Sequence, residues 1–406
     1  MTDNSLPPAP RPRGSATTAI VLLATAAFAA QAMVRSTDSL LPQIASDLGA
    51  TVGATSMIVT LYLLAHGSVQ LVVGPIGDRY GKYLCVTVAA GFATLMVIAC
   101  GLATSLPTLI AARLACGLAT GWIIPLAMAF IGDVIPIERR QQVLGTFLSG
   151  QILGQMFGQA ASGVLGDYFG WRNVFFILAV LLAIATAGLV FELARNPLTR
   201  SHGAAGKSGP GFVEGYRIVL RSRWARMVIF SAFVESAAMF GALTYVGAYL
   251  HSRFDVSFTL IGLFVGAFAI GGLAYSLSVR VLVRWLGQVG LTRTGGLLLC
   301  ASFLLLAFSP YYTLAPLATA GIGLGFYMLH NTLQVNATQM SPQARGTAVA
   351  VFSSALYLGQ TAGVAVFAVI YDRFTAVPAF VIAAAMLAWL GLWISRHLRR
   401  RAAEGL

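Results

Sequence analysis

Two carboxylates stand within stretches that are otherwise apolar. Asp38 falls in the apolar run 16–41, and Glu235 falls in a second run, 226–250. A carboxyl group held away from water can bind a proton and release it when a charge or a substrate approaches. Such a group can couple proton movement to a change of conformation. We therefore interpret Asp38 as the main proton or substrate acid and Glu235 as the second.

Two arginines also fall within apolar runs. Arg35 lies one helical turn before Asp38, on roughly the same face. Arg113 opens the segment RLACGLATG. A buried arginine is costly unless it faces protein or water, so Arg113 is a functional candidate. Two plainer interpretations stay open: Arg113 bonded to backbone carbonyls, and a local Arg35–Asp38 pair that only stabilises the first helix.

The composition requires that these residues lie in a membrane. The chain is 58% hydrophobic and 10% charged, with a mean hydropathy of +0.81. A membrane-spanning helix needs about 20 apolar residues, and the runs do not alternate as those of a β-barrel would. We predict an all-α membrane protein with spans at 16–41, 54–73, 84–104, 107–132, 142–165, 172–194, 226–250, 257–279, 291–309, 313–337, 344–370 and 376–395.

The basic residues predict the orientation in the membrane. Most of the 26 lysines and arginines fall in the segments that share a side with both termini, whereas the opposite loops hold Arg172, Arg253 and Arg373. Positive charge marks the cytoplasmic side. We expect the protein to lie in the inner membrane of a bacterium, with both termini in the cytoplasm. The net charge of +13 then reflects topology and contact with membrane lipid, and no nucleic-acid partner.

Several functional classes lack their sequence signatures. The four cysteines show no paired spacing for a disulfide or a metal, and no phosphate-binding glycine loop is present. No catalytic constellation is visible, so we expect no cofactor and no enzyme activity. Any transport must then be passive or ion-driven, and we expect a monomer. Residues 1–15 resemble a disordered tail and no signal peptide.

The chain divides into two related halves. A polar segment, 195–225, separates 16–194 from 226–395, and 396–406 forms a basic tail. An offset of 205 residues places Leu358-Gly359-Gln360 on Leu153-Gly154-Gln155 and Asp372 on Asp167. We interpret this as an internal repeat of two six-helix bundles.

The loop after the second predicted span carries a motif. The segment GPIGDRYGKYLCV places Gly74, Asp78, Arg79, Gly81 and Lys82 at the spacing G-x-x-x-D-R-x-G-R/K. This resembles the loop 2-3 motif of the major facilitator superfamily. The resemblance extends over about residues 16–395. It implies the major facilitator fold, with a cavity between the halves that opens to each side of the membrane in turn.

Further motifs refine this resemblance. Arg113 and Gly117 match the family's R-x-x-x-G pattern, whose arginine is implicated in proton coupling or in holding the substrate cavity. The pattern D-x-x-x-P at Asp38 resembles that of drug and sugar efflux members, the arabinose-efflux-like branch included. The family also implies a cytoplasmic latch: Asp133 with Arg79, and Asp78 at the start of the eleventh helix.

The fifth predicted helix carries glycines on one face. Gly150, Gly154 and Gly158 recur every four residues and would let another helix approach closely. The run partly resembles the antiporter motif, but Gln155 and Gln159 replace a proline and a glycine. This departure weakens antiport as an inference.

Aromatic and amide side chains suit a medium-sized organic substrate. Our candidates for the substrate cavity are Arg35, Gln155, Tyr245, Tyr327, His330, Asn331, Gln334 and Gln360. We predict a secondary transporter for a small molecule, with proton-coupled export of a drug, sugar or metabolite. One alternative is a proton-coupled symporter or facilitator that imports an organic solute, anionic solutes included. The other is a membrane receptor that transports nothing.

Overall fold

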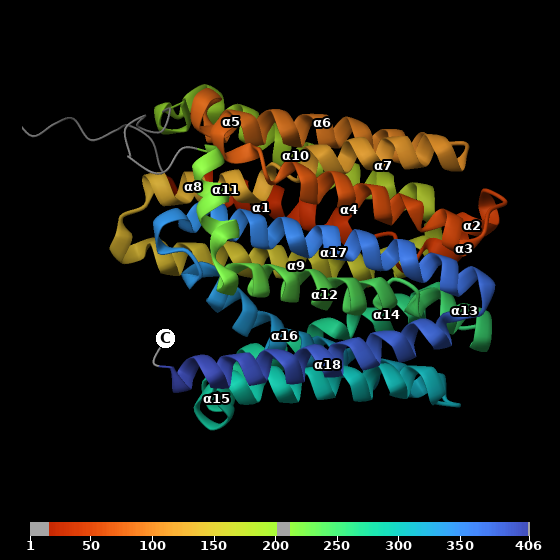
Figure 1. The fold of residues 1–406 in the computed structure, drawn as a ribbon. Helices are drawn as coiled ribbons and strands as arrows, with labels where there is room; N and C mark the ends of the chain where they lie inside the picture. Colours follow the sequence, from red (N-terminus) through yellow and green to blue (C-terminus); the bar gives the residue numbers. More distant parts are fainter. Residues whose placement is uncertain (1–15, 201–211, 405–406) are drawn as a thin grey trace, which may run out of the picture.

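The computed structural model describes residues 16–200 and 212–404, and in these ranges it contains helices and no strands. Residues 16–200 form the first bundle (Figure 1). Its helices are α1 (Ala16–Arg35), α2 (Leu41–Asp47), α3 (Val52–Thr55), α4 (Met57–Val69), α5 (Val73–Tyr80), α6 (Lys82–Leu102), α7 (Leu106–Thr120), α8 (Ile123–Val134), α9 (Ile137–Phe169) and α10 (Trp171–Arg195), followed by the short η1 (Pro197–Arg200). The expected tail 1–15 lies outside the described residues.

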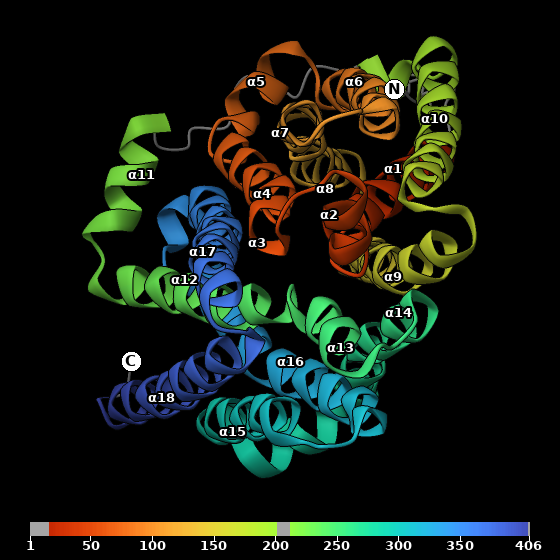
Figure 2. The same ribbon diagram turned by 90° about the vertical axis from the view of Figure 1, so that its right-hand side faces the viewer.

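Residues 212–404 form the second bundle. Its helices are α11 (Phe212–Arg221), α12 (Arg223–Leu243), α13 (Val246–Phe254), α14 (Phe258–Gly266), α15 (Phe268–Phe308), η2 (Tyr312–Leu314), α16 (Ala315–Gln339), η3 (Pro342–Ala344), α17 (Arg345–Arg373) and α18 (Ala376–Ala403). Seen along the helices, α1–α10 and α12–α18 form two groups with α9 beside α14 and α17 beside α4 (Figure 2).

The predicted spans are present, with changes in their limits. Ten segments of the described chain are long and apolar enough to cross a membrane. One of them, 258–308, contains Gly287 at φ 57°, a left-handed conformation that glycine tolerates, and there the chain reverses between two passes. The 33 residues of α9 add another pass. The described residues thus hold twelve passes.

Several predicted spans are broken inside the membrane. The predicted helix 16–41 ends at Arg35, and residues 36–40 form turns before α2 begins with Pro42 in its first turn. Likewise 226–250 is interrupted at 244–245 and 107–132 at 121–122. The hydropathy pattern missed these breaks because each is short and lies within a stretch whose average is apolar. Non-helical backbone at this depth is tolerated where protein surrounds it.

The polar segments are more ordered than predicted. The expected basic tail 396–406 begins as a continuation of α18, which runs to Ala403. The expected loop 195–225 contains α11 and the first residues of α12, whereas 201–211 lies outside the described residues. Arginine supports a helix well, so charge alone did not end α18.

The internal repeat recurs in the helix contacts. Gly154 and Gly158 of α9 lie so close to α1 that a Cβ would be 2.3 Å from the carbonyl oxygen of Phe28 and 2.1 Å from that of Ala32. In the second bundle, Gly359 and Gly363 of α17 meet Phe233 and Ala237 of α12 in the same way, at 2.3 and 2.0 Å. Each of these four residues of the second bundle stands 205 positions after its counterpart in the first bundle.

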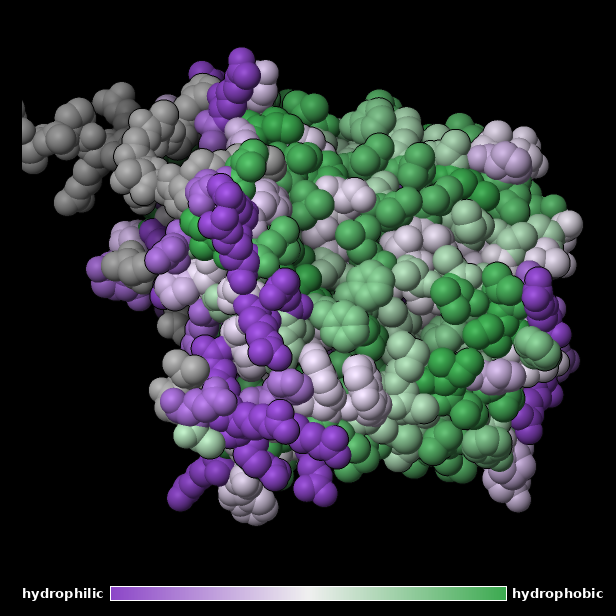
Figure 3. All heavy atoms as spheres, in the orientation of Figure 1, coloured by the Kyte–Doolittle hydropathy of each residue, from purple (hydrophilic) through white to green (hydrophobic). Residues whose placement is uncertain are grey.

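The surface agrees with a membrane location. Apolar residues cover the middle of the face in Figure 3, and hydrophilic residues gather at the end where the chain ends. We call this the terminal end of the molecule and the opposite one the outer end. Such an apolar band is what lipid would contact.

Candidate functional site

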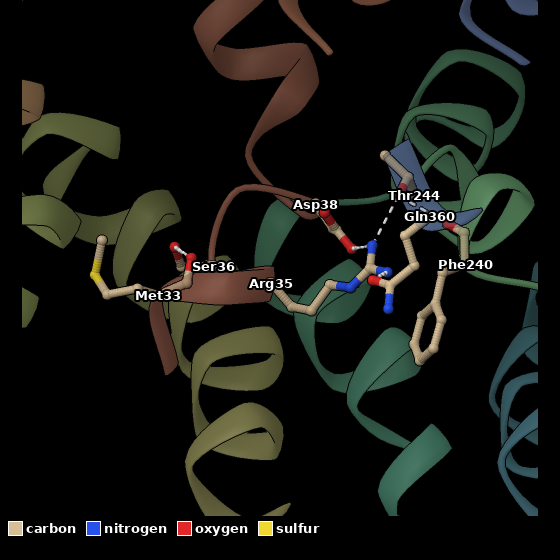
Figure 4. A network of polar contacts seen from close by, with 7 residues as sticks. All are labelled: Met33, Arg35, Ser36, Asp38, Phe240, Thr244 and Gln360. Carbon is tan, nitrogen blue, oxygen red and sulfur yellow. Dashed lines mark hydrogen bonds and ion pairs between the residues drawn. The ribbon is translucent and has the colours of Figure 1, made fainter. Parts of the chain in front are cut away.

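Arg35 bonds across the interface between the two bundles (Figure 4). Its Nη1 donates to Asp38 Oδ2 at 3.0 Å and to Thr244 Oγ1 at 3.0 Å, and its Nη2 donates to Gln360 Oε1. Its guanidinium stacks on Phe240, 4.3 Å from the ring centroid. Because Thr244, Gln360 and Phe240 belong to the second bundle, one cation of the first bundle bonds across the interface.

The broken helices create this arrangement. Because α1 ends at Arg35, Asp38 lies in the turn that follows, where its amide bonds the Arg35 carbonyl at 3.3 Å. Thr244 occupies the corresponding break between α12 and α13 and donates to Phe240 O at 2.9 Å. Arg35 and Phe240 are themselves 205 residues apart. The network therefore lies where the two repeats meet.

The Arg35 network is fully buried, and its polar groups are not all paired. Arg35 is 0% and Asp38 2% exposed. Asp38 Oδ1 and Arg35 Nε have no hydrogen-bond partner among the described residues. Removing one partner from a buried ion pair costs about 3–5 kcal/mol because a charge is left uncompensated. Protonation of Asp38 would thus strongly change the interactions that hold the Arg35 guanidinium in place.

The second predicted acid forms a side-chain contact that the sequence did not indicate. Glu235 Oε2, on α12, lies 2.8 Å from His330 Nδ1, on α16. Glu235 is 0% exposed, and its Oε1 has no partner in the described chain. His330 stacks on Phe326 with ring centroids 4.7 Å apart. Two titratable groups thus meet away from Arg35, inside the second bundle.

Arg113 adopts the plainer of its two predicted arrangements. Its Nε and Nη1 donate to the carbonyl oxygens of Ile58 and Met33, and its guanidinium lies 4.1 Å from the ring of Tyr62. Arg113 is 0% exposed and has no carboxylate partner in the described residues. The arginine therefore ties α7 to α4 and α1.

The predicted cavity residues do not form one cluster. Tyr245 is buried and donates to the carbonyl of Val364 at 2.8 Å, and Asn331 donates to Tyr275 at 2.7 Å. Gln334 is exposed and Gln155 partly exposed. Tyr327 packs among aromatic rings, with Phe326 5.2 Å away. Of these candidates, Gln360 joins the Arg35 network.

The glycine-rich loop differs from the predicted latch. Lys82 bonds both acids, Asp133 at 2.5 Å and Asp78 at 2.8 Å, whereas Arg79 lies over the ring of Tyr80. Asp78 is 64% exposed, so it does not cap α17 in this conformation. Gly81 joins α5 to α6 at φ 98°, which favours glycine; Gly74 lies open, since a Cβ there would meet no atom within 4 Å. The family pattern implies Arg79 as the partner of Asp133, whereas here Lys82 of the same motif is that partner.

The predicted glycine face of α9 is used in part. Gly154 and Gly158 contact α1, as described above, whereas a Cβ on Gly150 would meet no atom within 4 Å. Gly150 lies nearer the terminal end. The close approach of α1 and α9 therefore covers only the outer part of the predicted face.

Two aspartates clamp the bundles together at the outer end. Asp372, at the end of α17, accepts from the amide of Gly53 at 2.9 Å and from Thr51 Oγ1 at 2.6 Å. Asp167, at the end of α9, accepts from the amide and the hydroxyl of Thr259 at 3.0 and 2.6 Å. Each acid thus caps a helix start in the other bundle, α3 or α14. We call these contacts the outer clamps.

The sequence contained a signal for the outer clamps. Asp167 and Asp372 coincide in the internal repeat, and each faces the second residue of a helix that Thr51 or Ser257 caps. The first amides of a helix lack internal partners and attract negative charge. The sequence could not show which helix start each acid would meet.

Comparison with known proteins identifies the family. The model of the Major Facilitator Superfamily matches residues 23–364. The uncharacterized MFS-type transporter YceJ of Bacillus subtilis (strain 168) is 24% identical over 84% of this chain and 87% of its own length. The efflux pump radE of Floropilus chiversii is 29% identical over 39% of this chain and 30% of its own length.

A solved structure shows the same fold. The nucleoside transporter NupG superposes with a TM-score of 0.77 at 13% identity, over 93% of this chain and 99% of its own. The family match and the shared fold agree with the two six-helix bundles and the internal repeat described above. This chain belongs to the Major Facilitator Superfamily and is a multi-pass membrane transporter, not an enzyme.

Proposed function

We propose that this transporter exports a small organic compound in exchange for protons, by alternating access between the two sides of a bacterial inner membrane. Its termini would lie in the cytoplasm, and the protein would act as a monomer. The observation that carries the proposal is the buried Arg35 network, in which one ion pair of the first bundle bonds to Thr244 and Gln360 of the second.

A proton can act on this network directly. While Asp38 is ionised, its charge offsets that of Arg35 at 3.0 Å. When a proton binds to Asp38, the carboxylate charge is lost and Arg35 remains as a buried cation without its counter-charge. The arrangement that bonds Thr244 and Gln360 is then less favourable. Protonation would therefore bias the relative position of the bundles, as coupling requires.

The Glu235–His330 pair supplies a second place for a proton. It lies on two helices of the same bundle, so its protonation would act on α12 and α16 and leave the interface at Arg35 in place. We assign it the second role in coupling. Arg113, bonded to backbone carbonyls, would instead hold α1, α4 and α7 together.

The conformation described here fits one stage of such a cycle. Both outer clamps are formed, and the latch at the terminal end is not. We assign this conformation to the stage in which access is from the terminal end. Release of the clamps and formation of the Asp78 contact with α17 would produce the opposite stage.

The proposal of export draws on two further observations. Two relatives that match part of the chain are named as an efflux pump and a probable efflux pump, and the D-x-x-x-P pattern places Asp38 before Pro42. The aromatic rings of Phe326 and Tyr327 lie near the Glu235–His330 pair and favour an amphipathic substrate. The substrate class is a drug, a sugar or a metabolite.

The test uses everted membrane vesicles acidified by respiration and loaded with a pH-sensitive dye. Drugs, sugars, amino acids and organic acids are added singly to vesicles with wild type, Asp38→Asn or Asp255→Asn. Asp255 is an exposed outer acid that serves as a matched control. We expect one compound to release the quench with wild type and the control but not with Asp38→Asn.

Two results would contradict the proposal. Full proton-driven transport by Asp38→Asn would show that the Arg35 network is not the coupling site. A compound that alkalinises the medium only when added outside right-side-out vesicles would identify a symporter that imports. The importer would be consistent with Arg35 binding an anionic group.

A further inference from the structure

One face of α18 carries an aromatic stripe that ends in an arginine. Trp389, Trp393, His397 and Arg401 recur every four residues and so share a face of the helix. The rings of Trp389 and Trp393 have centroids 5.6 Å apart, and those of Trp393 and His397 are 4.5 Å apart. At the rise of a helix the stripe is ~18 Å long, about the depth of one leaflet with its headgroups.

The neighbouring helix α12 completes the stripe. Phe230 meets Trp393 edge-on with centroids 6.1 Å apart, and the Arg401 guanidinium lies 4.2 Å from the ring of Trp224. Phe230 is 48% and Trp389 49% exposed on the apolar flank of the protein. The two helices therefore present a continuous aromatic seam, which we call the α12–α18 seam, to the surrounding lipid.

The seam ends in a polar cavity at the terminal end. The cavity has a volume of about 390 Å³, and its lining includes Trp224, Gln288, Asn336, Gln339, Leu398 and Arg401. The polar side chains that line it are one cation, three amides and the Trp224 indole, and no carboxylate lines it. This composition favours an anion that accepts hydrogen bonds.

The charges around the cavity are mostly positive. Arg223 and Arg400, next in the chain to Trp224 and Arg401, are exposed. Glu404, one turn beyond Arg401, is exposed, and in the part of the chain that the structure describes it forms no ion pair. The lower end of the terminal side in Figure 3 is accordingly strongly hydrophilic. An anion would thus meet several guanidinium groups.

We propose that the α12–α18 seam binds an anionic phospholipid of the leaflet at the terminal end. The phosphate accepts hydrogen bonds from Arg401 and the cavity amides, and one acyl chain lies along Trp389, Trp393 and Phe230. A soluble anion would use the cavity but would gain nothing from an aromatic seam that continues into the bilayer. Basic pockets between membrane helices on this side suit phospholipid headgroups.

The test needs no transported substrate, so it is independent of the proposed function. The full chain is placed in phosphatidylcholine nanodiscs that contain a minority of phosphatidylglycerol with brominated acyl chains. Bromine quenches tryptophan fluorescence at short range. We expect more quenching than with the same fraction of brominated phosphatidylcholine, and expect the Trp389→Phe/Trp393→Phe variant to lose most of the difference.

The charge is tested with a matched pair of variants. Arg195, at the terminal end of α10, also lies over an aromatic ring, that of Phe191 at 4.1 Å. Arg401→Gln and Arg195→Gln remove the same charge from the same end of the molecule. One arginine near anionic lipid is worth about a fivefold change in affinity. We expect about fivefold weaker phosphatidylglycerol binding for Arg401→Gln and wild-type binding for Arg195→Gln.

Three results would overturn the proposal. Equal quenching by the two brominated lipids would show no preference for the anionic headgroup. Equal weakening by Arg401→Gln and Arg195→Gln would show general surface attraction. Displacement of the lipid signal by glycerol 3-phosphate at millimolar concentration would assign the cavity to a soluble phosphate compound. Retention of the lipid signal in its presence supports the lipid.

Discussion

At the scale of single residues, buried charges meet partners from distant parts of the chain. Arg35 bonds Gln360, which is 325 residues away, and Glu235 pairs with His330, 95 residues away. Each pair includes an oxygen or nitrogen that no described residue satisfies. Buried polar groups in this state respond strongly to a proton or a ligand.

The Glu235–His330 pair should behave as one unit. We predict that Glu235→Gln and His330→Gln each slow transport, and that the double variant is little worse than either single one. Residues in direct contact or in one hydrogen-bond network show coupling energies of about 0.5–3 kcal/mol. Initial transport rates of the four proteins measure the coupling. Additive losses would show that the two residues act separately.

A second residue-scale prediction concerns Asp47 at the outer end. The Arg172 guanidinium and then the Trp171 indole bond this carboxylate and hold the pKa of Asp47 below its ordinary value. A lowered folded pKa adds stability above the unfolded pKa, about 3.9, and loses it as the pH falls through the folded value. Asp47→Asn should therefore lower the thermal midpoint slightly at pH 7.

The pH dependence distinguishes this contact from a general loss of packing. The difference in thermal midpoint between wild type and Asp47→Asn should shrink below about pH 4. Because Asp47 is 45% exposed, solvent screens the contact and the effect should be small. A difference that stays constant from pH 7 to pH 3 would exclude the ion pair as its cause.

At the scale of helices, close approach at glycine holds each bundle together in the same register. Gly158 faces the backbone of Ala32 in one bundle, and Gly363 faces that of Ala237 in the other. Without a hydrophobic force between membrane helices, such contacts depend on packing. The breaks after Arg35 and Leu243 then place the polar turns against each other.

Two of the glycines of α9, Gly158 and Gly150, offer a matched pair for this point. A methyl group on Gly158 would lie 2.1 Å from a backbone oxygen, whereas on Gly150 it would meet nothing within 4 Å. We predict that Gly158→Ala lowers stability by about 1–3 kcal/mol. Gly150→Ala should leave it unchanged or raise it by up to about 1 kcal/mol. Thermal unfolding in detergent compares the two; equal effects would contradict the role of the contact.

At the scale of the whole molecule, the outer clamps favour one arrangement of the bundles. Each clamp places a carboxylate at a helix start of the other bundle, and both are formed in the described structure. Such contacts are worth about 1 kcal/mol each. Together they would shift a population about thirtyfold.

We predict that the Asp167→Asn/Asp372→Asn variant opens the outer end more often. Spin labels on Thr104→Cys and Tyr311→Cys, exposed outer positions of the two bundles, would report a longer distance population, in a background without the four native cysteines. Asp255→Asn removes an exposed outer charge and serves as the control. An unchanged distance distribution in the double variant would show that the clamps do not set the state.

The sequence by itself determined the membrane fold and the repeat. Span length and hydropathy follow from the thickness and apolarity of the bilayer, which act on each segment separately. The offset that relates Asp167 to Asp372 is likewise a property of the chain alone. Buried charges such as Asp38 and Glu235 stood out because an apolar span makes them costly.

Only the tertiary structure decided which groups meet. Lys82 in place of Arg79 as the partner of Asp133, and His330 as the partner of Glu235, depend on the relative rotation and height of packed helices. The interruption of the first span after Arg35 depends on surrounding protein that satisfies non-helical backbone. Hydropathy averages over a segment, so it contains no information on these directions. Packing supplies that information because interlocked side chains admit few relative positions of the helices.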